Sequence, residues 1–157
     1  MFDLERLPKQ TGNYVIGGYS AQPFSLVMKK FGLLELPGGY YLYCGSAHGP
    51  GGLKSRVGRH LERGTKKFWH FDYLKGFLQP QCVWWQVNPA NFECATAQFL
   101  FSLAGASCVV KGFGASDCRE GCPSHLVYFP EKVQVEQAWI ALENQKWQYA
   151  QMCAEAD

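Results

Sequence analysis

Residues 40–60 read YYLYCGSAHGPGGLKSRVGRH. The tyrosines at the start of this stretch favour a pleated, half-buried surface, which predicts a strand over residues 40–44. A loop rich in glycine follows over residues 45–52, and a basic amphipathic helix follows the loop. A strand that ends in tyrosine, a turn and a helix that bears arginine can place a phenol and a guanidinium beside one phosphate.

The helix is expected over residues 52–63, because Leu53, Val57 and Leu61 recur every four residues and form one apolar stripe. Beside the stripe, one arc holds the basic side chains Arg56, Arg59, His60 and Arg63. The whole chain has a net charge of only +2, so this arc is a local basic patch. Such a patch is typical of a phosphate-contacting face, and the alternative is a helix face that is simply solvated.

The rest of the chain predicts a single α/β domain over residues 1–157, with its core over about residues 12–129. We expect a small, mainly antiparallel central sheet of roughly three to five strands, flanked by helices. Further strands are expected over residues 12–16, 24–28, 33–36, 83–87 and 124–129. Further helices are expected over residues 68–77, 89–104 and 131–150.

The composition is that of a packed globular protein, with 47% apolar and 15% aromatic residues. No apolar run reaches the ~18 residues of a membrane span, and the N-terminus has no apolar segment of the secretory type. We therefore expect a cytoplasmic protein that does not enter a membrane. The seven cysteines are scattered and odd in number, which favours reduced thiols or metal ligands over a disulfide framework.

Glu93 is out of place in the predicted helix over residues 89–104, because it shares an apolar face with Ala97, Leu100 and Ala104. A carboxylate on such a face is costly unless it is paired or bound to a metal. Glu93 is therefore a candidate functional residue. The alternative is an acid in the first helical turn, where the helix dipole favours negative charge.

Cys118, Cys122 and His125 follow the pattern C-x3-C-x2-H, which is close to the spacing of zinc ligands. A closed structural site needs a fourth ligand, and both Cys94 and Cys108 are candidates. The favoured interpretation is the simpler one, in which the cysteines are buried as small apolar residues. His125 is alternatively a phosphate contact, because it opens a strand near the predicted site.

Two tripeptides, GNY at residues 12–14 and YCG at residues 43–45, resemble the two signature tripeptides of the GIY-YIG nuclease family. Asn13 and Cys44 stand where the family usually has an aliphatic residue. A closer resemblance covers nearly all of residues 12–129, to a GIY-YIG-like subfamily with GSA-GPGGL, WHxDYL and SDC-C-SHL motifs. In this chain the motifs read GSAHGPGGL, WHFDYL and SDCREGCPSHL. Some relatives in that subfamily are fused to a base-excision repair enzyme.

The resemblance implies a divalent-metal-dependent endonuclease that hydrolyses DNA phosphodiester bonds, in DNA repair or processing. It implies that Tyr14 or Tyr43 activates water and that Arg56 holds the phosphate. His60 would shuttle a proton or contact the phosphate, and Glu93 would bind Mg²⁺ or Mn²⁺. Taken alone, the two tyrosines would read as sheet or core residues.

The expected partner is structured or damaged DNA, contacted by side chains and backbone around the loop and the basic helix. The candidates for this contact are Gly45, Ser46, Lys54, Arg59, Arg63, His70 and His125. The main alternative is a DNA- or RNA-binding module that keeps the same scaffold without turnover. A third interpretation is an interaction domain stabilised by zinc.

Overall fold

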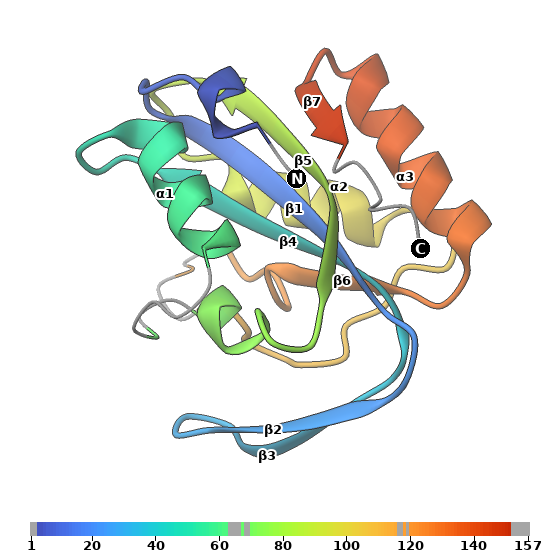
Figure 1. Ribbon diagram of the computed structural model, residues 1–157. Helices are drawn as coiled ribbons and strands as arrows, with labels where there is room; N and C mark the ends of the chain where they lie inside the picture. The colour runs from blue at the N-terminus through green and yellow to red at the C-terminus, as the bar shows by residue number, and fades with distance from the viewer. Residues whose placement is uncertain (1–2, 63–66, 68–69, 116–117, 119, 152–157) are drawn as a thin grey trace.

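The computed structural model describes residues 3–62, 67, 70–115, 118 and 120–151 of the 157-residue chain (Figure 1). The described part contains a five-stranded antiparallel sheet in the order β6-β4-β1-β5-β7 and a separate two-stranded hairpin, β2-β3. Helices flank the large sheet. The predicted mixed α/β fold with a mainly antiparallel sheet is confirmed.

The centre of the sheet is β1 (Gly12–Ser20), which pairs with β4 (Gly39–Ala47) along its whole length and with β5 (Gln79–Val87) on its other side. The outer strands are β6 (Leu126–Phe129) beside β4 and β7 (Gln148–Gln151) beside β5. Because β1 is buried on both faces, its register with β4 is fixed by packing on both sides.

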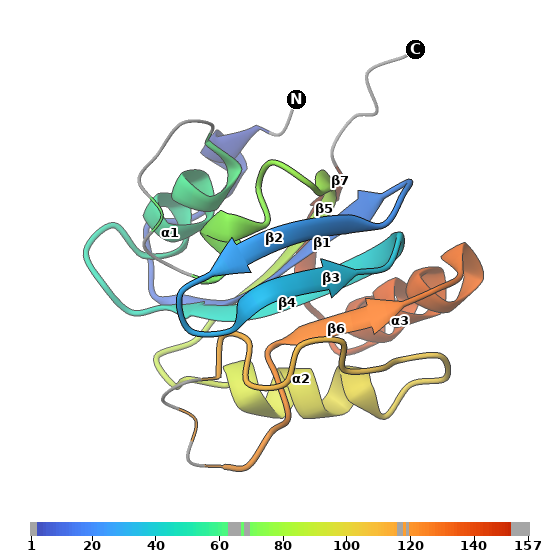
Figure 2. The same ribbon diagram turned by 90° about the horizontal axis from the view of Figure 1, so that it is seen from below.

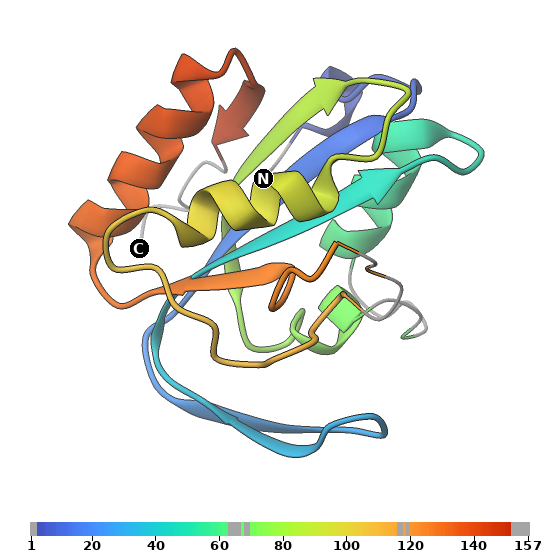
Figure 3. The ribbon, with the colours of Figure 1, turned by 180° about the vertical axis from the view of Figure 1, so that it is seen from behind.

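Helices cover the two faces of the sheet. Helix α1 (Gly52–Leu61) lies on one face, while α2 (Glu93–Phe101) and α3 (Lys132–Asn144) lie on the other (Figures 1 and 3). Alternate strand residues enter two separate cores: Tyr14 packs with the α1 side, whereas Val15 packs with α2 and α3. The side-chain alternation of a strand therefore decides which residues face α1.

The hairpin extends beyond the ends of β1 and β4 (Figures 1 and 2). Its strands are β2 (Phe24–Met28) and β3 (Gly32–Leu36), which agree with the predicted strands to within one residue. Leu26 and Leu36 are buried in the core on the α1 side, and Val27 faces solvent with 69% of its surface exposed. None of the helices in the described residues has the length and apolar composition that crossing a membrane requires.

Two predicted elements near the site are wrong. Strand β4 continues to Ala47, so Gly45 and Ser46 belong to the sheet and not to a loop. Residues 68–77 were expected to be helical, but the described part contains only a short 3-10 helix, η2 (His70–Tyr73). A second 3-10 helix, η1 (Leu4–Arg6), precedes β1.

The C-terminal prediction is also wrong, because the expected helix over residues 131–150 ends at Asn144. The chain then turns through Lys146, whose φ is 65°, and forms the edge strand β7. Tyr149 of this strand packs its ring on Trp84 of β5, with ring centroids 4.5 Å apart. This aromatic contact between strands replaces the helical continuation that local sequence favours.

Candidate active site

The candidate site lies where β4 extends beyond its neighbour β6. Strand β6 pairs with β4 from Tyr40 to Tyr43, so residues 44–47 project past the end of the pairing. The amide of Cys44 still donates to the carbonyl of His125, over 2.8 Å. Side chains from β1, α1 and α2 gather at this projecting end.

The side chain of Tyr14 reaches this end by passing over Gly45 of the neighbouring strand. The two residues are paired in the register of β1 and β4, and a Cβ atom at Gly45 would lie only 2.3 Å from Cζ of Tyr14. The ring of Tyr14 therefore lies directly over the Cα atom of Gly45. Glycine is required here because any side chain would occupy the position of the phenol ring.

The Tyr14 hydroxyl begins a buried chain of hydrogen bonds. It lies 2.8 Å from Nε2 of His60, and Nδ1 of His60 lies 3.2 Å from Oδ1 of Asp72. All three side chains are at least 97% buried. Because a carboxylate only accepts, Nδ1 of His60 carries the proton and Nε2 accepts from the tyrosine hydroxyl. Burial lowers the pKa of His60, although Asp72 raises it, which favours the neutral ring.

Cations surround the carboxylate of Asp72. Nζ of Lys75 lies 3.2 Å from Oδ1, and Nε of Arg59 lies 3.8 Å from Oδ2. Lys75 also donates to the carbonyl oxygen of Arg59. These contacts hold the Asp72 carboxylate in place, and the carboxylate orients His60. Arg59 therefore supports the hydrogen-bond chain through Asp72 and does not extend freely into solvent.

Burial raises the pKa values of both signature tyrosines, Tyr14 and Tyr43, above the ordinary value. Each is raised further by the charge of Glu93, while the charge of Arg56 lowers both. Both residues are therefore protonated phenols at neutral pH. A base beside the hydroxyl is needed before either tyrosine can accept a proton, and His60 supplies one for Tyr14.

Ser46 connects the arginine and the glutamate of the site. Its carbonyl accepts from a guanidinium nitrogen of Arg56 over 3.0 Å, and its hydroxyl donates to Oε2 of Glu93 over 2.9 Å. Arg56 also hydrogen-bonds Tyr14 and lowers its pKa. A cation from α1 and a carboxylate from α2 thus meet at the projecting end of β4, beside the tyrosine.

Asn13 holds the segment that leads into α2. Its fully buried side chain donates to the carbonyl of Ala90 over 3.0 Å and accepts from the amide of Phe92 over 2.9 Å. The side chain of Asn91 then accepts from the amide of Glu93 over 3.0 Å. These bonds satisfy free amides at the helix N-terminus and fix the position of the Glu93 side chain.

The other candidates for substrate contact are placed differently. Lys54 makes an ion pair with Glu5 over 2.9 Å at the surface of α1. His70 accepts a hydrogen bond from the amide of Gly114 over 2.5 Å, and its ring packs on Phe113. Both contacts of His70 tie η2 to residues 113 and 114. Arg63 lies outside the described residues.

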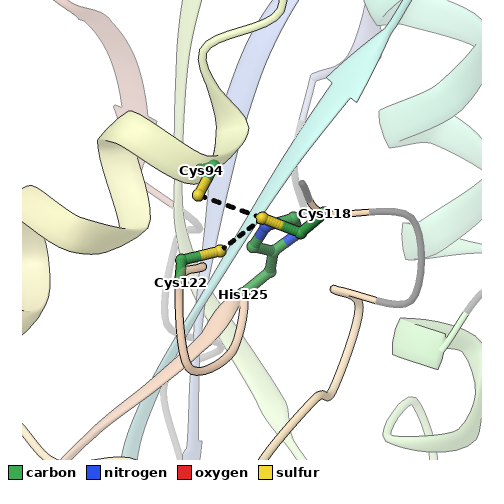
Figure 4. Close-up of side chains that lie close together, drawn as sticks. All are labelled: Cys94, Cys118, Cys122 and His125. Atoms are coloured by element: carbon green, nitrogen blue, oxygen red, sulfur yellow. Dashed lines mark hydrogen bonds between the residues drawn. The ribbon is translucent and has the colours of Figure 1, made fainter. Parts of the chain in front are cut away.

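His125 joins a second cluster beside the site. The donor atoms of Cys94, Cys118, Cys122 and His125 all lie within 4.8 Å of one another (Figure 4). Of the two cysteines considered as a fourth member, Cys94 belongs to this cluster and Cys108 is an exposed free thiol outside it. Burial lowers the pKa of His125, which is only 2% exposed. This burial makes His125 poorly placed to contact a substrate.

A family model described as "Domain of unknown function DUF123" matches residues 13–147. The chain belongs to the DUF123 family. This family is GIY-YIG-like, which confirms the resemblance at that level. No curated protein and no solved structure gives a significant match to the chain.

Within this DUF123 domain, sequence reasoning does not assign the roles of two residues. Asn13 reads as a departure from the tripeptide pattern, although a lone amide inside an apolar strand is itself a signal of a buried hydrogen-bonding role. The sequence fits Asp72 as a helix-capping residue as well as it fits Asp72 as a functional residue. Its contact with His60 depends on the path of the chain after α1, which the sequence pattern does not define.

Proposed function

We propose that this DUF123 protein is a divalent-metal-dependent endonuclease that hydrolyses DNA phosphodiester bonds. The observation that carries the proposal is the 2.8 Å contact between the hydroxyl of Tyr14 and Nε2 of His60, with Asp72 behind the imidazole. This arrangement gives a buried phenol a way to lose its proton at neutral pH. Arg56 and Glu93 lie beside that phenol, as phosphate chemistry requires.

The mechanism begins with proton transfer. Tyr14 accepts a proton from the attacking water as it passes its own proton to Nε2 of His60, and Asp72 stabilises the imidazolium that forms. The resulting hydroxide attacks phosphorus, and the bond to the leaving oxygen breaks. Arg56 offers two parallel N–H donors to the phosphate oxygens as negative charge accumulates on them. Tyr43 packs edge-on against His60, with ring centroids 6.0 Å apart.

The donor set suits a hard divalent cation. Glu93 contributes one partly buried carboxylate, with one oxygen accepting from Ser46. Mg²⁺ and Mn²⁺ are commonly held by one carboxylate together with substrate phosphate and water. When bound, the cation supplies charge neutralisation at the leaving oxygen. Glu93 would hold it on the side of the site that faces α2.

A panel of structured DNAs (flaps, forks, nicks and bubbles), incubated with Mg²⁺ or Mn²⁺, tests the proposal. We expect the wild-type protein to cut at least one of them, and Arg56→Ala and Glu93→Ala to lose about 10²–10³ in rate. Circular dichroism of each variant checks that the fold is kept. Cleavage that survives in both variants contradicts the site assignment.

The same panel distinguishes the inactive alternative. Wild-type protein that binds DNA or RNA without cutting it in either metal, with an affinity that falls steeply with salt, would be a binding module on this scaffold. A role in DNA repair or processing is part of the proposal. It predicts that branched or nicked duplexes are cut faster than a continuous duplex of the same sequence.

A further inference from the structure

Four soft or borderline donor groups converge beside the candidate active site. They come from separate segments: Cys94 lies in the first turn of α2, Cys118 and Cys122 lie in the irregular segment that follows it, and His125 directly precedes β6 (Figure 4). Cys94, Cys122 and His125 are all less than 9% exposed. A buried cluster of three thiols and an imidazole is unusual unless something binds it.

The distances are those of free thiols rather than of a disulfide, and they suit a metal. Sγ of Cys118 lies 3.2 Å from both Cys94 Sγ and Cys122 Sγ, far beyond the S–S bond length of about 2.05 Å. Zn–S bonds of about 2.3 Å and Zn–N bonds of about 2.0 Å, in a tetrahedron, separate the donor atoms by about 3.5–3.8 Å. The observed upper limit of 4.8 Å and the closest pairs at 3.2 Å bracket these values.

His125 gives an independent sign of a ligand. Its Nε2 is buried and has no hydrogen-bond partner among the described residues. The backbone of Gly114 lies beside the same ring. A metal-bound histidine binds the metal through one ring nitrogen, so a buried nitrogen without a protein partner fits a ligand. A buried imidazole nitrogen without a partner would otherwise be costly.

We propose that Cys94, Cys118, Cys122 and His125 form a closed structural zinc site. Thiolate and imidazole ligands select Zn²⁺ over the hard cations Mg²⁺ and Mn²⁺. All four tetrahedral positions are filled by protein, so no position remains for water and the ion is not catalytic. This site is separate from the cation at Glu93, and its existence does not depend on nuclease activity.

The site joins two elements that border the candidate active site. Cys94 follows Glu93 on α2, and His125 precedes Leu126, which pairs with Tyr43 of β4. The zinc ion would therefore fasten the start of α2 to the start of β6. It would stabilise the segment between these elements, whose described residues form no helix or strand.

Metal analysis of the purified protein tests the site directly. We expect about one zinc per chain after purification without chelator, and loss of most of that zinc in Cys94→Ser. The matched control is Cys108→Ser, because Cys108 is an exposed free thiol outside the cluster. This control should keep the wild-type zinc content. Equal zinc in both variants overturns the assignment.

A second measurement uses wild-type protein alone, in case Cys94→Ser fails to fold. Protein stripped of metal is titrated with Co²⁺ and then with Zn²⁺. The proposal requires thiolate-to-cobalt charge-transfer bands and tetrahedral d–d bands that saturate at about one equivalent and disappear when Zn²⁺ is added. Absence of these bands, a Cys118–Cys122 disulfide in the purified protein, or stoichiometric iron with sulfide in place of zinc each overturns the proposal.

Discussion

His60 holds its place in the site between a phenol and a carboxylate, and both contacts are buried. Burial lowers its pKa below the ordinary value of about 6.5, while the hydrogen bond and charge of Asp72 raise it and Arg56 and Lys75 lower it. At pH values between the pKa of His60 in the folded protein and its pKa of about 6.5 in the unfolded chain, the unfolded chain binds more protons than the folded one. The contribution of His60 to stability is therefore complete above about pH 6.5 and is lost as the pH falls.

Removing the charge of Asp72 should lower the pKa of His60 further, because the imidazolium loses its counter-ion. We predict that an NMR titration gives a His60 pKa below about 6.5 in the wild type and a still lower one in Asp72→Asn. A value above 6.5 in the wild type, or a rise in the variant, contradicts the assignment of a neutral His60 held by an ionised Asp72.

At the level of single residues, the family resemblance identifies Tyr14, Tyr43, Arg56, His60 and Glu93 as site residues, and the structure brings them together at the end of β4. Sequence reasoning cannot decide between the two tyrosines. The difference between them is spatial, because the 2.8 Å contact with His60 is made by Tyr14. The sequence likewise does not decide between Cys94 and Cys108 as the fourth member of the cysteine cluster. Cys94 joins it because α2 packs close to residues 118 and 120–125.

Among the secondary-structure elements, β4 determines whether the Tyr14 ring can reach the site. Gly45→Ala places a methyl group 2.3 Å from the Tyr14 ring, which must shift away from His60. We predict that the variant loses most of its cleavage activity and about 1–3 kcal/mol of stability. Gly76→Ala is the control, because a Cβ there meets nothing within 4 Å. Equal cleavage rates in the two variants contradict this packing role.

Helix α2 is held at its start by Asn13. Asn13→Ala removes the hydrogen bonds that join this buried side chain to the backbone of the exposed residues Ala90 and Phe92, at about 0.5–1.5 kcal/mol for each bond. We predict a lower urea midpoint for this variant. Asn144→Ala, at the exposed C-terminal end of α3, should stay within about 0.5 kcal/mol of the wild type. If both variants unfold at the same urea concentration, Asn13 does not anchor α2.

Local sequence predicts some elements well and others poorly, for physical reasons. The hairpin β2-β3 follows from two apolar runs around a lysine-rich turn, and its boundaries are nearly correct. Strand β7 is missed because residues 148–151 have no strong strand pattern and depend on β5 for pairing. Strand β5 begins earlier than predicted, at Gln79, because Pro80 is tolerated near the start of a strand.

At the scale of the whole molecule, one sheet is shared by two cores, so the stability of the α2 side and that of the α1 side are linked. We predict that a zinc-selective chelator, added in excess Mg²⁺, moves thermal unfolding to lower temperature. A domain of this size loses about 2–4 °C for each kcal/mol. Cys108→Ser should show the same chelator-induced shift as the wild type. An unchanged melting temperature in both proteins contradicts a structural role for the metal.

The most direct test of the proposed active site is the single-turnover cleavage rate of Tyr14→Phe. This change removes one oxygen and keeps the ring over Gly45, so the fold should be kept, at a cost of about 1–3 kcal/mol because the buried Nε2 of His60 loses its partner. We predict a loss of about 10²–10⁴ in rate, because the water then has no proton acceptor. Tyr19→Phe, at the other end of β1, should cleave at the wild-type rate. Cleavage by Tyr14→Phe at the wild-type rate would contradict the role of Tyr14 as the proton acceptor.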